Sequence, residues 1–392
     1  MAAMKGAHRF ILLLILSFAH GFRQGITPSR TATQLSVSSI SRELLEQMVV
    51  KEQAAPRACD EHVWRQDKLE RRLGDLWKGS HATAPLHSME IDVGAAAAAP
   101  PVVILHGLLG SSRNFQSWAM QLAGMLEVPR RVILLDLRNH GESPHMPKMG
   151  YLDMAADVVR FLQHQKIDKA SLIGHSMGGK VASAVALLFP EKVEALGVLD
   201  IAPVPYEDTG KNGVWTEVNT LLNALSEMPV SRSESSSVGE DSQDVGGDIL
   251  GGKKEADAWL RDRGISDDGL RAFALTNMVA DKDALGVSRL RWKIGIDVIR
   301  SSLGILGGFD IGQGLQESAT AVGLTYPGDA FFVSGGRSQF IRSSHLPELS
   351  ALFPNFKIAK IRDAGHWLHH EDPAGSQEMV KTFLDAQAQN NQ

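Results

Sequence analysis

The sequence of 392 residues predicts an α/β fold, with a mostly parallel β-sheet, helices on both faces and a helical lid. Three observations lead to this prediction. Short, continuously apolar runs alternate with helical stretches between residues 102 and 202, the alternation stops at residue 206, and it resumes at residue 330. Such alternation indicates right-handed βαβ units, and a helical excursion between two halves of the sheet is typical of a lid over a site.

Each element follows from its own pattern. Residues 86–94 alternate between apolar and polar, as in an edge strand. Continuous apolar runs predict buried strands at 102–106, 131–137, 170–174 and 193–202. Helical periodicity predicts helices at 115–126, 154–165 and 179–189. Beyond the lid we expect strands at 330–336 and 356–366 and a closing helix at 376–387.

The same patterns divide the chain into segments. In chain order we expect a targeting leader (1–42), a charged helical extension (43–83), the first part of the core (84–205), a helical lid (206–325) and the second part of the core (326–392). Within the lid, residues 231–255 are rich in Ser, Gly and acidic residues, and no aromatic residue occurs between Trp215 and Trp259. We expect a disordered insertion there, because so little apolar area cannot offset the entropy of ordering.

The leader carries five basic residues and no acidic one. Residues 10–18 form a short apolar run behind Lys5 and Arg9, as in a secretory signal, and the run is about half as long as a membrane span. Residues 23–42 are rich in Arg, Ser and Thr, as in a transit peptide. This order resembles the bipartite leaders of plastids acquired by secondary endosymbiosis. We expect an organellar protein with no stable membrane span in the mature chain; a mitochondrion or the secretory pathway is the alternative.

Composition excludes several other classes. The formal net charge of −5 provides no basic footprint for nucleic acid. The single Cys59 excludes an internal disulfide and a Cys-based zinc site. The histidines at 366–370 lack the His-Glu-x-x-His spacing of zinc proteases, and no nucleotide motif is present. We therefore expect neither a metal nor a cofactor.

Residues 174–178 read Gly-His-Ser-Met-Gly and match Gly-x-Ser-x-Gly, with an apolar strand before the motif and a helix after it. This context predicts a nucleophile elbow, a sharp turn that lifts a serine hydroxyl above the sheet edge. The flanking glycines fit a turn that leaves no room for Cβ atoms. We therefore expect Ser176 to be a nucleophile.

A serine nucleophile needs a base, and His366 follows the last expected strand, as the chain order Ser, acid, His requires. His369 and His370 lie close in sequence and remain alternatives. For the acid, Asp200 ends the strand that follows the elbow, at the same edge of the sheet, where a carboxylate can hold the imidazole in the required tautomer. Asp297 is the alternative acid.

Two backbone N–H groups should form the oxyanion hole. One is that of Met177, directly after the nucleophile. The other belongs to the loop 106–110, His-Gly-Leu-Leu-Gly, in which glycines allow the backbone to approach the site, and we expect it to be that of Leu108.

These residues together resemble the α/β-hydrolase superfamily, and within it the branch of the alpha/beta hydrolase domain-containing 11 proteins and bacterial short-chain esterases. The segments that carry the resemblance are VVILHGLLGSSRNF, LDLRNHGESPH, LIGHSMGGKVA, VLDIAPV, FFVSGGRSQFI and AGHWLHHEDP. It implies a serine hydrolase with a small helical lid. The acid of that branch matches Asp200, while the family's usual acid position holds Ser338. Arg138, Asn139 and His140 would shape the loop beside the site.

The expected activity is hydrolysis of carboxylic esters through an acyl-enzyme. Apolar lid residues indicate a short to medium acyl group, although a lid core would show the same pattern: Leu221, Leu222, Leu225, Phe273 and Leu275. An acyl-CoA or acyl-protein thioesterase is an alternative, with Arg337 and Arg342 as candidates to bind CoA phosphates. A binding or protective partner protein that keeps the fold but turns over little substrate is another. The sequence leaves the oligomeric state open.

Overall fold

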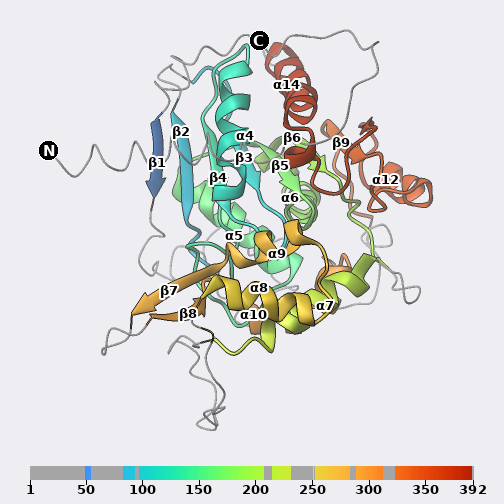
Figure 1. Ribbon diagram of the computed structural model, residues 1–392. Coiled ribbons are helices and arrows are strands. Elements are labelled where there is room, and N and C mark those ends of the chain that lie inside the picture. Colours follow the sequence, from blue (N-terminus) through green and yellow to red (C-terminus); the bar gives the residue numbers. More distant parts are fainter. Residues whose placement is uncertain are drawn as a thin grey trace, which may run out of the picture. The chain divides into compact units, whose positions relative to one another are not determined.

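The computed structural model describes residues 49–53, 83–92, 97–206, 214–230, 250, 252–282, 288–311 and 323–390 (Figure 1). The expected leader and most of the extension 43–83 lie outside the described residues, and so does most of the expected insertion 231–255. In the part of the chain that is described, no helix combines the length and the apolarity needed to cross a bilayer.

An eight-stranded sheet has the order β1-β2-β4-β3-β5-β6-β9-β10. Its strands are β1 (Val49–Gln53), β2 (Ser88–Asp92), β3 (Val102–Leu105), β4 (Val132–Leu135), β5 (Ala170–His175), β6 (Val193–Leu199), β9 (Ala330–Gly335) and β10 (Phe356–Ile361). The six strands from β4 to β10 pair in parallel, whereas β1 and β2 are antiparallel to their neighbours. All residues of β3 to β6 are buried, as in a parallel sheet covered on both faces.

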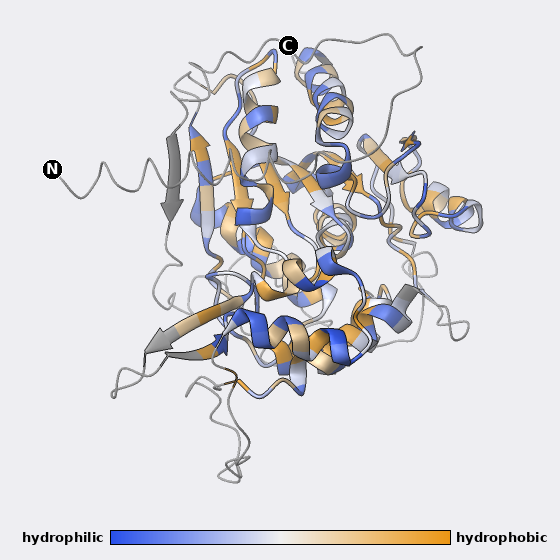
Figure 2. Cartoon of the chain, viewed as in Figure 1, coloured by the Kyte–Doolittle hydropathy of each residue, from blue (hydrophilic) through white to orange (hydrophobic). Residues whose placement is uncertain are grey.

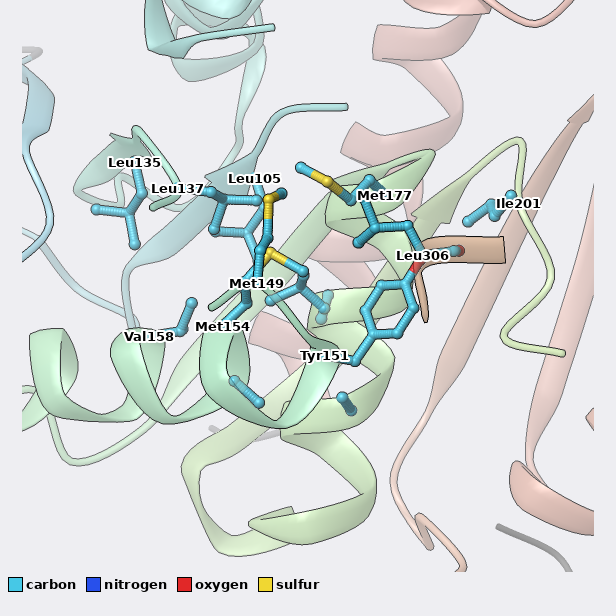
Figure 3. Packing of buried hydrophobic residues seen from close by; sticks show 14 of the residues in the cluster. Leu105, Leu135, Leu137, Met149, Tyr151, Met154, Val158, Met177, Ile201 and Leu306 are labelled. Carbon is cyan, nitrogen blue, oxygen red and sulfur yellow. The ribbon is translucent and has the colours of Figure 1, made fainter. Parts of the chain in front are cut away.

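Helices cover both faces of the sheet (Figure 1). On one face pack α4 (Ser112–Met125) and α14 (Pro373–Asn390), and on the other α5 (Tyr151–His164) and α6 (Met177–Leu188). Because side chains alternate along a strand, Val102 and Ile104 of β3 join the first layer and Val103 and Leu105 the second. Figure 3 shows part of the second layer, and Figure 2 shows how hydrophobic residues concentrate on the strands. The predicted α/β class and the central elements are confirmed.

Between β6 and β9 the described chain forms α7 (Val214–Ser226), α8 (Lys253–Asp262), α9 (Asp268–Leu275), β7 (Met278–Lys282), β8 (Ser288–Trp292), α10 (Ile296–Ser301) and α11 (Leu303–Gly307). Four of the apolar residues named for the lid, all except Phe273, are buried in the same cluster as the second layer. Short elements complete the described chain: η2 (Pro190–Lys192), η3 (Ser343–His345), α12 (Leu346–Leu352) and α13 (Leu368–Glu371).

Three local expectations were wrong. The extension was expected to contain no strand, but β1 pairs antiparallel with β2, so β2 is not the edge of the sheet. The segment 206–300 was expected to be mostly helical, with no further strand before residue 330, but β7 and β8 form an antiparallel hairpin within it. Helix α8 begins at Lys253, inside the stretch expected to be disordered. In the two strand cases a pairing partner decides the structure, which local propensity does not reveal.

Candidate active site

Ser176 lies between β5 and α6 in a strained turn. Its φ of 52° and ψ of −124° are unusual for a residue with a side chain. Its own N–H donates to the carbonyl oxygen of Leu199 at 3.0 Å, and its carbonyl oxygen accepts from the N–H of Gly179 at 2.8 Å. These bonds join the turn to β6 and to the start of α6, so the surrounding structure holds the strained conformation.

The two glycines of the motif are required by close backbone contacts. A Cβ on Gly174 would lie 2.2 Å from the carbonyl oxygen of Gly178. A Cβ on Gly178 would lie 2.4 Å from the carbonyl oxygens of Leu105 and His106 at the end of β3. No side chain fits at either position, because the atoms it would meet belong to the backbone. The turn therefore has the geometry of a nucleophile elbow.

The structure brings Ser176, His366 and Asp200 together. His366 follows β10, and its Nε2 lies 3.0 Å from the Oγ of Ser176. Its Nδ1 lies 2.8 Å from the Oδ2 of Asp200, which follows β6. Since the carboxylate accepts the Nδ1–H, the neutral ring presents the lone pair of Nε2 to the serine hydroxyl. The ring of Phe340 stacks on the imidazole, with 4.0 Å between centroids.

Asp200 is fully buried and its carboxylate has three donors. Besides His366, the N–H of Gly335 donates to Oδ1 at 2.8 Å, and the hydroxyl of Ser338 donates to Oδ2. These bonds compensate the burial of a charge and fix the plane of the carboxylate. Ser338 thus occupies the position where the resemblance places the usual acid, and it supports the carboxylate supplied by the neighbouring strand. The sequence indicated the position of Ser338 but not its hydrogen bond to Asp200.

The alternative residues lie elsewhere. Asp297 is exposed on α10 and accepts a hydrogen bond from the Oγ of Ser226 at 3.1 Å. His369 stacks on Phe115, with 4.2 Å between ring centroids. His370 is exposed on α13. None of the three has a hydrogen bond with Ser176 or His366 in the described part of the chain.

The two backbone groups expected at the oxyanion hole flank the serine. Met177 is the first residue of α6, and the positive end of a helix favours a negative charge there. The loop that contains Leu108 lies against the elbow, since a Cβ on Gly107 would come within 3.2 Å of the Cβ of Ser176. Neither the N–H of Leu108 nor that of Met177 donates to an acceptor among the described residues, so both can receive a substrate oxygen.

Comparison with known proteins identifies the family. The model of the alpha/beta hydrolase fold family matches residues 100–373, more than half of the chain. The chain belongs to the α/β-hydrolase family. It is 34% identical to an sn-1-specific diacylglycerol lipase, ABHD11, of Xenopus tropicalis over 81% of this chain and 88% of that one. It is also 30% identical to Esterase YbfF of Escherichia coli, in an alignment that covers 73% of this chain and 93% of that one.

A solved structure agrees with these relatives. A marine microorganism esterase superposes with a TM-score of 0.60 at 30% identity, covering 77% of this chain and 99% of that one. The predicted resemblance, both to the superfamily and to its branch of short-chain esterases, is therefore confirmed.

In this α/β-hydrolase, His175 contacts His366 and was not singled out from the sequence. Its Nε2–H donates to the backbone carbonyl of His366 at 2.9 Å, and the two rings lie 4.9 Å apart. Burial lowers the pKa of His175 well below its ordinary value, so the ring is neutral. The only signal in the sequence was its place inside the elbow motif. The side chain joins the turn that carries Ser176 to the loop that carries His366.

The segment between β6 and β9 lies over the same region of the hydrolase. The amide of Asn277, directly before β7, donates to the carbonyl of Leu109 at 2.8 Å. The N–H of Gly295 donates to the carbonyl of Asn139 at 3.0 Å. Phe273 of α9 and Trp367, the neighbour of His366, have ring centroids 5.3 Å apart. Among the described residues, no group of three or more His, Cys, Asp or Glu side chains is arranged to hold a metal ion.

Proposed function

We propose that this protein is a serine hydrolase that cleaves carboxylic esters of short to medium acyl chains through an acyl-enzyme. The observation that carries the proposal is the hydrogen-bonded series Ser176–His366–Asp200 above a strained elbow. Membership of the α/β-hydrolase family supports it, as do relatives named lipase and esterase. The substrate is a small molecule.

The proposed mechanism is acyl transfer in two steps. Ser176 attacks the acyl carbonyl while His366 takes its proton, and the carboxylate of Asp200 stabilises the imidazolium. The N–H groups of Leu108 and Met177 stabilise the oxyanion of the tetrahedral intermediate. His366 then protonates the leaving alcohol, and water repeats the sequence to release the acid.

An apolar acyl group is supported by the surroundings of His366. Four of the five apolar lid residues are buried in a core cluster. The aromatic rings near the base are Phe340, which stacks on the imidazole, and Phe273 beside Trp367. Aromatic side chains commonly line sites for the apolar part of a small molecule, so these rings favour an apolar acyl group. The same residues would serve a thioesterase. For that alternative Arg337 is a weak candidate, because it pairs with Glu371 at 2.7 Å, and the Nε of Arg342 donates to the backbone of Gln339.

Labelling of the purified full-length chain by a fluorophosphonate probe tests the proposal. We expect the wild type to be labelled and Ser176→Ala not to be labelled. A series of p-nitrophenyl esters and matching acyl thioesters then measures kcat/KM against acyl length. A folded wild type that neither reacts with the probe nor cleaves any ester would overturn the proposal and favour the binding or protective protein.

A further inference from the structure

Two buried histidines join the loop after β3 to the loop after β4. The Nε2 of His106, in the first loop, accepts the N–H of Leu137 in the second at 3.0 Å. The Nε2 of His140, in the second loop, accepts the N–H of Leu109 in the first at 3.1 Å. The rings lie 5.1 Å apart, and both are at most 2% exposed. We call this reciprocal pair, His106 and His140, the histidine clasp.

The hydrogen bonds of the clasp determine both tautomers. Because each Nε2 accepts a backbone N–H, each ring carries its proton on Nδ1. The Nδ1–H of His106 donates to the carbonyl oxygen of Gly107 at 2.8 Å, and that of His140 to the carbonyl oxygen of Arg138 at 3.0 Å. Burial lowers the pKa of both rings, that of His140 to about 3. Both rings are therefore neutral, and every ring nitrogen is committed to the backbone.

The bonds of the clasp act on the two peptide groups on either side of Leu108. The carbonyl of Gly107 and the N–H of Leu108 belong to one planar peptide unit, so holding the carbonyl also orients the N–H. The N–H of Leu109 belongs to the next unit, which His140 holds. Leu109 itself has a φ of 59°, a conformation that a branched side chain rarely adopts without such restraint.

We propose that His140, together with His106, is a positioning residue that aims the N–H of Leu108 at the oxyanion. The proposal rests on the proposed function, since Leu108 matters in this way only if a tetrahedral oxyanion forms. Both rings are buried and bonded only to the backbone, so neither histidine is placed to bind a substrate directly. The clasp keeps the donor in place before the reaction, so no reorganisation is needed when the charge develops.

Two substitutions of His140 test this. His140→Phe keeps a ring but removes the acceptor for Leu109, whereas His140→Gln offers a side-chain oxygen near the position of Nε2. We expect kcat for an ester to fall about 10- to 100-fold in His140→Phe with little change in KM, because a displaced oxyanion donor weakens the transition state alone. His140→Gln should recover part of the loss. His145→Gln, an exposed histidine of the same loop, should behave as the wild type.

An alkyl boronic acid separates positioning from a merely structural role. Its adduct with Ser176 places an oxygen in the oxyanion hole, so its Ki should rise by the same factor as kcat falls. A folded His140→Phe variant with wild-type kcat and wild-type Ki would overturn the proposal, and so would a change confined to KM. If the wild type itself does not react with a fluorophosphonate or bind the boronic acid, the proposed function fails instead.

Discussion

Asp200→Asn is the substitution that tests the site most sharply, because it changes one atom of a fully buried group. In the wild type the N–H of Gly335 bonds to Oδ1, while Ser338 and His366 both donate to Oδ2. An asparagine that keeps its oxygen on Gly335 turns its NH₂ group towards Ser338 and His366. The serine hydroxyl can rotate to accept a hydrogen bond. The imidazole can accept only by moving its proton to Nε2, which faces Ser176.

In that tautomer His366 cannot take the proton of Ser176. The corresponding change in a serine protease triad lowers kcat about 10⁴-fold, so we expect a loss of about 10³ to 10⁴ here, or about 4 to 5.5 kcal/mol in the barrier. The measurement is kcat/KM for a p-nitrophenyl ester, with circular dichroism to verify folding. Asp297→Asn is the control and should stay within about twofold, because that carboxylate is exposed. A folded Asp200→Asn with less than a tenfold loss would refute the role of Asp200.

Three further predictions concern stability and targeting. The pKa of His140 lies at about 3 in the folded protein, below the 6.5 of an unperturbed histidine. Between these pH values the unfolded state binds one more proton than the folded state. The free energy of unfolding should therefore fall as the pH drops from about 6.5 towards 3. In urea unfolding, the free energy of unfolding should change less steeply with pH in His140→Phe than in the wild type, by up to about 1.4 kcal/mol per pH unit. The buried His106 and His175 contribute to the slope in both proteins. Gly174→Ala should lower the free energy of unfolding, measured by thermal unfolding, by about 3 kcal/mol or more, because the new Cβ meets the backbone of Gly178. The control Gly252→Ala should lower it by less than about 1 kcal/mol, because no atom lies within 4 Å of the new Cβ. Residues 1–42 fused to a fluorescent protein should direct it to a plastid; mitochondrial fluorescence would contradict the bipartite interpretation.

The central strands and helices could be predicted because local sequence patterns, namely apolar runs and helical periodicity, indicate which segments are buried. The same holds for Ser176 and His366, since each lies in a short motif at a strand end. The acid was harder. A sequence shows where strands end but not which carboxylate reaches the imidazole, so Asp200 and Asp297 stayed open until the structure placed Asp200 2.8 Å from His366.

The partners of Ser338 and His175 could not be predicted for a related reason. Ser338 lies 138 positions from Asp200 in the chain, and His175 lies 191 positions from His366. No periodicity encodes contacts over such separations. Strand β1 is a similar case, because its segment contains charged residues and becomes a strand only through its hydrogen bonds to β2.

The position of β1 also determines which N-terminal truncations would expose the sheet. Removal of the expected leader after residue 42 leaves Val49–Gln53 attached, and β2 stays covered along all five of its residues. Processing beyond residue 53 would strip β1 from the sheet and leave β2 with a row of unpaired N–H and C=O groups facing outward. Such an edge is a template for pairing with another chain. A chain that keeps β1 therefore covers this edge, and a chain that begins after residue 53 is expected to be prone to self-association.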